Sequence, residues 1–213
     1  METERLILRR FSPDDWRGLH AYLSDPLVVA YEPYSVYSEA ECVREAARRA
    51  HDPAFWAVCL RESGRLIGNL YFALQEPQDY QTWELGYVFN RQFQGMGYAT
   101  EAAQRLLRYG FEECGAHRVI ARCDPRNVPS WRLLERLGMR REGLFLQDAY
   151  FQQDDQGNPL WHDAYGYAIL VEEGVKPVNL GRAMRAPTES SFARWDAPSP
   201  TNTPISTITD RQT

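Results

Sequence analysis

The spacing of hydrophobic and polar positions changes several times along the chain, and each change marks a predicted strand or helix. Residues 4–11 carry closely spaced apolar side chains and predict a first strand. Apolar side chains then recur at helical spacing over residues 16–23, after Ser12 and Pro13, which suit the N-cap and first position of a helix. A second helix is expected after Ser38, because residues 38–41 have the Ser-x-x-Glu spacing of a capping box.

Three further strands are predicted close together, over residues 55–61, 66–73 and 83–90. Their short separations favour an antiparallel meander, since a parallel connection needs a much longer crossover. The third segment leads into a Gly-rich turn and then into a long helix over about residues 99–114. Gly110 inside that helix costs about 1 kcal/mol relative to alanine, so we expect close packing there.

The following residues predict a strand, a helix and a hairpin. Residues 117–123 have the pattern of a buried strand, and a short helix is expected over residues 130–137, with Ser130 as N-cap and Gly138 after its end. Residues 139–151 and 161–171 flank a loop rich in turn formers. The whole order predicts an α/β (α+β) fold with a mixed, mostly antiparallel central sheet and helices on both faces.

Composition and charge limit the class of protein. The chain has 213 residues, 44% of them hydrophobic, and fits one domain with an appendage. We predict that residues 1–174 form this domain and that residues 175–213, rich in Pro, Ser and Thr without periodicity, form a flexible tail. The net charge of −5 argues against nucleic acid as a partner. No apolar run reaches the roughly 20 residues of a membrane span.

Cysteine and histidine positions give no sign of a disulfide framework or a metal site. The N-terminal residues also lack the apolar core of a signal peptide, so we expect a cytoplasmic protein with reduced thiols. The cysteines and histidines are all far apart in sequence: Cys42, Cys59, Cys114 and Cys123, and His20, His51, His117 and His162.

The Gly-rich segment QFQGMGYA, residues 92–99, suggests an anion site. It joins a predicted strand to a predicted helix, and the unpaired N–H groups at a helix start bind phosphates. Gly95 and Gly97 would let the backbone approach such a ligand closely. A dinucleotide fingerprint would need a third glycine where Thr100 stands, and a Walker A loop would need a lysine. A phosphate cradle and an ordinary glycine turn both stay open at this point.

With its flanks, the turn resembles the acyl-CoA signature Gln/Arg-x-x-Gly-x-Gly/Ala of the GNAT superfamily of N-acetyltransferases, at Gln92, Gly95 and Gly97. WELGYVFN resembles the strand before that signature, and GYATEAAQRLLRYGFEECGAHRV resembles the helix and strand after it. DPRNVPSWRLLERLGMRREG resembles the Asn-x-x-Ser…Glu-x-x-Gly-Phe segment of the Rim-like branch, which acetylates ribosomal-protein N-termini. Met139 replaces the phenylalanine, and the match runs from about residue 4 to residue 171.

This resemblance implies an N-acetyltransferase that moves an acetyl group from its co-substrate acetyl-CoA to a primary amine by direct attack, without a metal. The strand over residues 86–90 would offer backbone groups to the pantetheine arm, and N–H groups from about Gln92 to Gly97 would hold the pyrophosphate. A homodimer built through edge strands is also compatible with the family. The residues expected to bind acetyl-CoA are Tyr87, Val88, Phe89, Gln92, Gln94, Gly95, Met96, Gly97, Tyr98, Ala99 and Asn127.

Acetyl transfer needs a neutral amine, a stabilised oxyanion and a proton for the leaving thiolate. Glu84 is the candidate base, since it lies on the strand entering the proposed site and partial burial would raise its pKa; a merely solvated carboxylate is the alternative. The tyrosine that many GNAT enzymes use as acid is replaced by Leu134, so the Rim-like resemblance makes Ser130 the candidate acid. The alternative is that Ser130 only caps the helix. Cys123 is expected to be a buried strand residue rather than a nucleophile.

The acceptor is less well defined by the sequence. Arg91 and Arg126 are candidates for phosphate contacts. The aspartates of the last hairpin and its loop are candidates for attracting a cationic amine. A protein N-terminus and a small amine stay open as acceptors, with a non-catalytic acyl-CoA-binding module as the alternative function. The residues considered for an acceptor pocket are Trp16, Tyr31, Tyr34, Tyr37, Tyr150, Trp161, Asp148, Asp154, Asp155 and Asp163.

Overall fold

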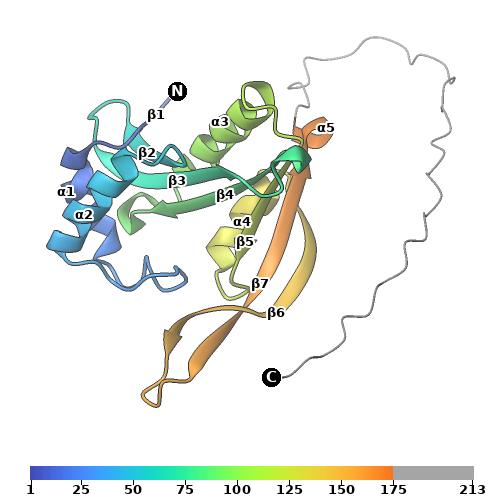
Figure 1. Cartoon of the computed structure of the whole chain (residues 1–213). Coiled ribbons are helices and arrows are strands. Elements are labelled where there is room, and N and C mark those ends of the chain that lie inside the picture. Colours follow the sequence, from blue (N-terminus) through green and yellow to red (C-terminus); the bar gives the residue numbers. More distant parts are fainter. Residues whose placement is uncertain (175–213) are drawn as a thin grey trace, which may run out of the picture. The chain divides into compact units, whose positions relative to one another are not determined.

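A computed structural model describes residues 1–174, and the predicted tail lies outside the described residues. The elements follow the predicted order (Figure 1). The strands are β1 (Leu6–Arg9), β2 (Phe55–Leu60), β3 (Leu66–Leu74), β4 (Thr82–Phe89), β5 (Arg118–Cys123), β6 (Arg140–Gln153) and β7 (Pro159–Leu170). The α-helices are α1 (Trp16–Leu23), α2 (Glu39–Ala50), α3 (Tyr98–Glu112), α4 (Val128–Arg136) and α5 (Val171–Gly174), and the 3₁₀ turns are η1 (Pro13–Asp15), η2 (Gln78–Tyr80) and η3 (Arg91–Phe93).

The strands form one seven-stranded sheet in the order β1-β2-β3-β4-β5-β7-β6. Every neighbouring pair is antiparallel except β4 and β5, which run parallel. The predicted meander and the mixed sheet are therefore confirmed. β6 and β7 extend beyond the rest of the sheet as a long hairpin (Figure 1).

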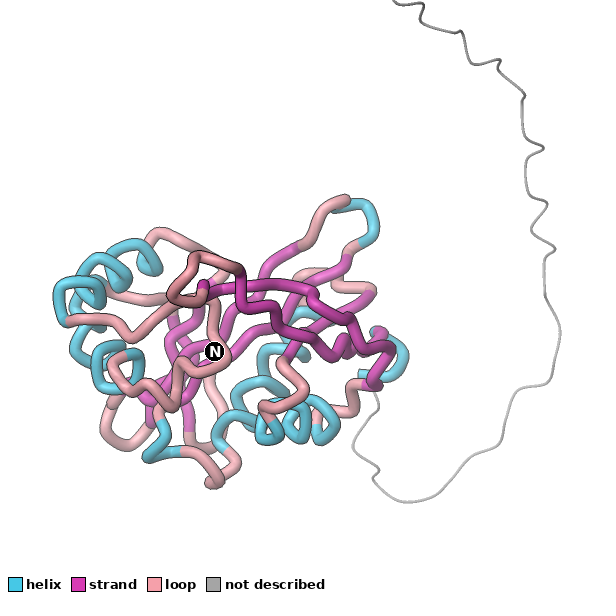
Figure 2. The backbone as a smooth tube through the Cα atoms, turned by 90° about the horizontal axis from the view of Figure 1, so that it is seen from below, coloured by secondary structure: helices cyan, strands magenta, loops and turns pink. Residues whose placement is uncertain are grey.

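Helices lie on both sides of the strands (Figure 2), and each side has its own apolar cluster. On one face, α3 and α4 bury Leu106 and Leu134 against strand residues such as Leu85. On the other face, α1 and α2 bury Leu19 and Cys42 against the same sheet. Each fully buried leucine contributes about 1.5–3 kcal/mol relative to an exposed one, so both helix layers are held firmly.

Local signals in the sequence explain where several elements begin and pack. The Ser38 hydroxyl accepts the N–H of Glu41 and the Glu41 carboxylate accepts the N–H of Ser38, which confirms the capping box. A Cβ at Gly110 would lie 2.5 Å from Phe72 Cζ, so only glycine allows α3 to approach β3 this closely. Gly138 follows the end of α4 with a φ of +82°, as expected of a helix C-terminus.

Candidate active site

The two parallel strands at the centre of the sheet separate soon after they meet. β4 pairs with β5 only at Thr82, Trp83 and Glu84, and beyond Glu84 no pairing joins them. The other edge of β4 stays paired with β3 as far as Phe89. A gap therefore opens between these strands beyond Glu84, and it leaves backbone groups of β4 free on the β5 side.

Two cavities meet at this gap. The α3 cavity, of about 330 Å³, lies between the Gly-rich turn, the start of α3 and α4. The α2 cavity, of about 660 Å³, lies between the loop that precedes α2, α2 itself, and the strands β4, β5 and β7. Residues that line both cavities define their junction: Glu32, Tyr87, Val88, Asn127 and Ser130.

The Gly-rich turn offers free N–H donors, but the first of them is at Gly95 and not at Gln92 as expected. The N–H groups of Gln92, Phe93 and Gln94 are already used, because they donate to the Asn90 side chain, the Asn90 carbonyl and the Arg91 carbonyl. Within the described chain, the N–H groups of residues 95–100 have no hydrogen-bond acceptor. Five of these residues, all except Met96, line the α3 cavity. This row of donors at the start of α3 fits a pyrophosphate.

The turn is held in shape from the N-terminal segment of the chain. Arg5 donates to the Met96 carbonyl at 3.0 Å, lies over the ring of Tyr98 at 4.5 Å, and forms an ion pair of 2.6 Å with Glu101. Gly97 has a φ of +82° and precedes Tyr98, the first residue of α3. The turn therefore combines a backbone conformation that favours glycine with a side-chain support.

The start of α4 differs from the prediction and frees a hydroxyl. Asn127 is the N-cap, since its side-chain oxygen accepts the N–H of Ser130 at 3.3 Å, and the helix begins two residues before Ser130. The expected N-cap role of Ser130 is therefore wrong: asparagine caps equally well, and Pro129 is tolerated in the first helical turn. The Ser130 hydroxyl instead lies 2.8 Å from the hydroxyl of Tyr87. Leu134 is fully buried in the core.

Glu84 lies on the wall of the α2 cavity. Alternation along β4 directs Leu85 to the α3 side of the sheet and Glu84 to the α2 side, where Val88 also packs. Burial raises the pKa of the Glu84 carboxyl, and Arg122 on β5 partly opposes this shift. The expectation of a partly buried carboxyl with a raised pKa is confirmed.

Glu32 is a second carboxyl at this site and was missed by the sequence analysis. It lies in the loop between α1 and α2, where its N–H donates to the Val29 carbonyl. Burial raises its pKa to about 7, although a hydrogen bond from Tyr34 and the charge of Arg49 oppose the shift. Only the three-dimensional path of the loop brings it to the junction, and no motif around it indicated this.

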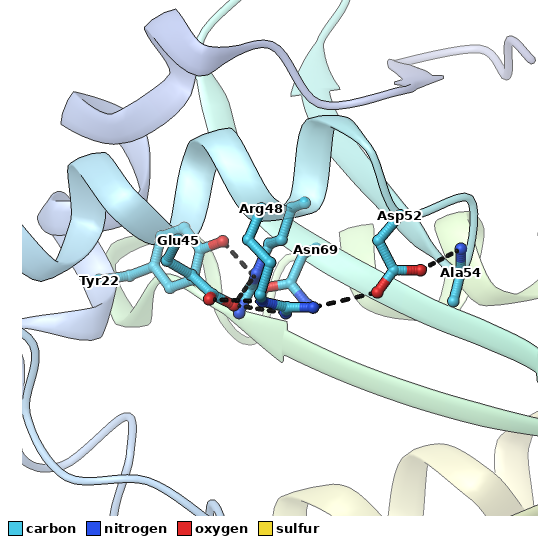
Figure 3. Close-up of polar contacts among 7 residues, drawn as sticks. Tyr22, Glu45, Arg48, Asp52, Ala54 and Asn69 are labelled. Atoms are coloured by element: carbon cyan, nitrogen blue, oxygen red, sulfur yellow. Dashed lines mark hydrogen bonds and ion pairs between the residues drawn. The ribbon is translucent and has the colours of Figure 1, made fainter.

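A polar network lines the α2 side of the α2 cavity (Figure 3). Arg48 donates to both oxygens of Glu45 at 2.8 Å and to Asp52 at 3.0 Å. Arg49, only 2% exposed, donates to Glu45 at 2.6 Å. The two arginines and the two carboxylates compensate one another in charge, so the network at α2 is largely neutral.

The aromatic and acidic residues considered for an acceptor pocket divide into two groups. Tyr31, Tyr34 and Tyr37 line the α2 cavity, together with Asp148 and Asp163 of the hairpin strands. The others lie elsewhere. Trp16 packs in the α1–α2 core, the half-exposed rings of Tyr150 and Trp161 meet edge to face, and Asp154 and Asp155 lie at the β6–β7 turn.

The two arginines suggested for phosphate contacts do not line the α3 cavity. Arg126 pairs with Asp124, and Arg91 lies 3.9 Å from Asp25. The arginine that lines the α3 cavity is Arg136 on α4, which the sequence analysis missed. Arg136 is far from the Gly-rich turn in sequence but lines the same cavity, because α4 packs beside α3.

The Cys123 thiol is buried, and burial raises its pKa to about 11. A thiol with this pKa is almost entirely protonated near neutral pH and is a poor nucleophile.

Within residues 1–174, no group of three His, Cys, Asp or Glu side chains is arranged to hold a metal ion. None of the helices in the described part of the chain is long and apolar enough to cross a membrane.

Comparisons with known proteins agree with this geometry. Residues 5–140 match the acetyltransferase (GNAT) domain. YnaD of Bacillus subtilis, an uncharacterised N-acetyltransferase, is 41% identical over 172 residues, which is 80% of this chain and 96% of YnaD. The [ribosomal protein uS5]-alanine N-acetyltransferase of Escherichia coli is 27% identical over 164 residues, which is 67% of this chain and 79% of that enzyme.

A crystal structure of a GNAT-family acetyltransferase from Bacillus anthracis has the same fold, with a TM-score of 0.73 and 39% identity. The match covers 81% of this chain and 99% of that one. The resemblance found in the sequence is thereby confirmed. The chain belongs to the GNAT family of acetyltransferases, enzymes that transfer an acetyl group from acetyl-CoA to an amine.

Proposed function

We propose that this enzyme binds acetyl-CoA in the α3 cavity and a primary amine in the α2 cavity, and that the amine attacks the thioester directly where the cavities meet. The free N–H groups of residues 95–100, five of which belong to residues that line the α3 cavity, are the observation that carries the proposal. Backbone donors at a helix start suit a pyrophosphate, and the free edge of β4 suits an extended pantetheine arm.

In this scheme Glu84 takes a proton from the incoming ammonium group, because only a neutral amine has a lone pair for attack. The nitrogen forms a bond to the acetyl carbon and loses its second proton, and the C–S bond then breaks to give the amide and the CoA thiolate. Ser130, hydrogen-bonded to Tyr87, gives its proton to the leaving thiolate and is reprotonated through the Tyr87 hydroxyl or solvent.

The acceptor is proposed to be the N-terminal amine of a protein or a small-molecule amine. The Rim-like segment around Asn127 and Ser130, and the relative that acts on ribosomal protein uS5, support a peptide. The α2 cavity, of about 660 Å³, is large enough for one or two residues of a peptide or for a small amine. We further propose a cytoplasmic enzyme that forms a homodimer.

Two measurements test this function. Calorimetry with acetyl-CoA should give a saturable site, and release of free CoA should rise when peptides or amines from a panel are added. If acetyl-CoA binds but no amine in a broad panel accelerates CoA release, the chain is a non-catalytic acyl-CoA-binding module. If acetyl-CoA does not bind, the proposed function is wrong.

A further inference from the structure

Glu32 occupies a position that Glu84 does not. Both carboxyls line the α2 cavity, but only Glu32 also lines the α3 cavity. Tyr87, Asn127 and Ser130, which share the junction with it, surround the place where the nitrogen would meet the thioester in the proposed function. Of the two carboxyls, Glu32 is therefore the one at the junction of the cavities.

The chemistry requires two proton transfers from the same nitrogen. An ammonium group must lose one proton before it can attack, and the nitrogen carries a positive charge again once the new C–N bond has formed. Loss of a second proton prevents the amine from leaving again and commits the adduct to breaking the C–S bond. A carboxylate that has accepted the first proton cannot accept the second until it has lost the first.

We propose that Glu32 is a catalytic residue that accepts this second proton, from the nitrogen bonded to the acetyl carbon, after Glu84 has accepted the first. The products are the amide, CoA thiolate and two protonated carboxyls. The thiolate takes one proton by way of Ser130, and one proton is released to solvent, so the atoms and charges balance. This inference rests on the proposed function and adds a second proton acceptor to it.

The surroundings of Glu32 suit this role. The titratable groups that face it are Tyr34 in its own loop, Arg49 on α2 and Tyr87 on β4. None of the described ion pairs involves Glu32, since Arg49 is engaged by Glu45. Burial outweighs Tyr34 and Arg49 and raises the Glu32 pKa to about 7, close to the working pH that an efficient base requires.

The test compares E32Q, E84Q and wild type in steady-state pH–rate profiles with the best amine of the panel. E32Q should lower kcat by about 10²-fold with near-normal acetyl-CoA affinity. Its loss should persist at high pH, because the second proton appears only after attack. The loss in E84Q should shrink at high pH, where the free amine is already neutral. E62Q, in the exposed turn after β2, is the matched control and should behave as wild type.

A readout independent of activity is the titration of the Glu32 carboxyl itself. In the ¹³C NMR spectrum of the acetyl-CoA-free protein, one carboxyl resonance should titrate near pH 7 and be missing in E32Q. Turnover in E32Q equal to wild type across the pH range would overturn the inference while leaving the acetyltransferase intact. A loss in E32Q that vanishes at high pH would also overturn it, since Glu32 would then serve the first proton. If wild type acetylates no amine, it is the proposed function that fails.

Discussion

The hydroxyl of Tyr87 lies 2.8 Å from Oγ of Ser130, and this contact joins β4 to α4 beside the gap between β4 and β5. Tyr87 also donates to the Ser130 carbonyl at 3.0 Å. Burial raises the pKa of the Tyr87 hydroxyl, so it stays protonated through neutral pH. Because its single proton is donated to the Ser130 carbonyl, resupply of Ser130 requires this hydroxyl to turn toward Oγ. In the proposed mechanism this pair takes the place of the tyrosine acid that many GNAT enzymes have where this chain has Leu134.

We therefore expect Ser130→Ala to lower kcat by about 10²-fold, at the low end of general-acid catalysis, with little change in acetyl-CoA affinity. Steady-state kinetics and calorimetry measure the two quantities. Ser63→Ala, in the exposed turn between β2 and β3, is the control. Unchanged kcat in Ser130→Ala would assign thiolate protonation to Tyr87 alone or to solvent, and Tyr87→Phe would then separate these two.

Gly97→Val should abolish acetyl-CoA binding. Valine strongly disfavours the φ of +82° at this position, and its Cβ would lie 3.4 Å from Arg5 Nη2. Gly64→Val is a matched control, because Gly64 also has a positive φ, of +69°, but has no atom within 4 Å of an added Cβ. Both variants carry backbone strain, and calorimetry should show loss of binding only in Gly97→Val. Retained affinity in that variant would exclude this turn as the pyrophosphate site.

Arg5→Ala should weaken acetyl-CoA binding by about 10-fold without changing kcat at saturating acetyl-CoA. The side chain supports the Met96 carbonyl and Tyr98, so its removal loosens the donors of the turn rather than the chemistry. A 10-fold loss corresponds to about 1.4 kcal/mol, close to the lower end of the range of about 1.5–3 kcal/mol for a hydrogen bond to a charged group. Arg61→Ala is the control, since Arg61 donates to the Thr3 carbonyl and not to the turn. Equal Kd values for Arg5→Ala and wild type would refute the support role.

The fold was predictable because local signals and hydrophobic spacing agree along most of the chain. The capping box at Ser38, the close spacing of the three meander strands and the glycine after α4 each determine an element with little help from distant residues. The start of α4 was misplaced because Asn127 and Ser130 are both good N-caps three residues apart. Local sequence could not decide between them.

The site was predictable only where one segment carries it. The turn over residues 92–99 and Glu84 lie on consecutive elements, so their positions follow from the strand–turn–helix pattern. Glu32 and Arg136 reach the cavities, and Arg5 reaches the Gly-rich turn, from three other parts of the chain. Their roles depend on how distant segments pack, and such packing leaves no periodic or motif-like signal in a single sequence.

A chain ending at Gly174 should keep both its thermal stability and its acetyl-CoA affinity. Every residue that lines the α3 cavity lies between Val28 and Arg136. Gly174 itself should be retained, because it packs so closely on Phe111 that a Cβ there would lie 2.4 Å from that ring. Calorimetry and thermal unfolding compare the shortened chain with the full one. A large loss in either would make residues 175–213 part of the domain rather than a tail.

Glu84→Gln keeps the size and hydrogen-bonding reach of the side chain but cannot accept a proton, and should lower kcat by about 10²–10⁴-fold with near-normal acetyl-CoA binding. The base works as a carboxylate, and burial raises its pKa, so wild-type activity should increase as the pH rises through that raised value. Arg122→Gln removes the charge that opposes this shift, which should move the acidic limb of the profile to higher pH. The deficit in Glu84→Gln should become smaller at high pH, because a growing fraction of the amine is then neutral without help. pH–rate profiles of the three proteins, measured with one amine, check all of these directions. Equal kcat in Glu84→Gln and wild type throughout neutral pH would remove Glu84 from the proton path, and an unshifted limb in Arg122→Gln would mean that another group controls it.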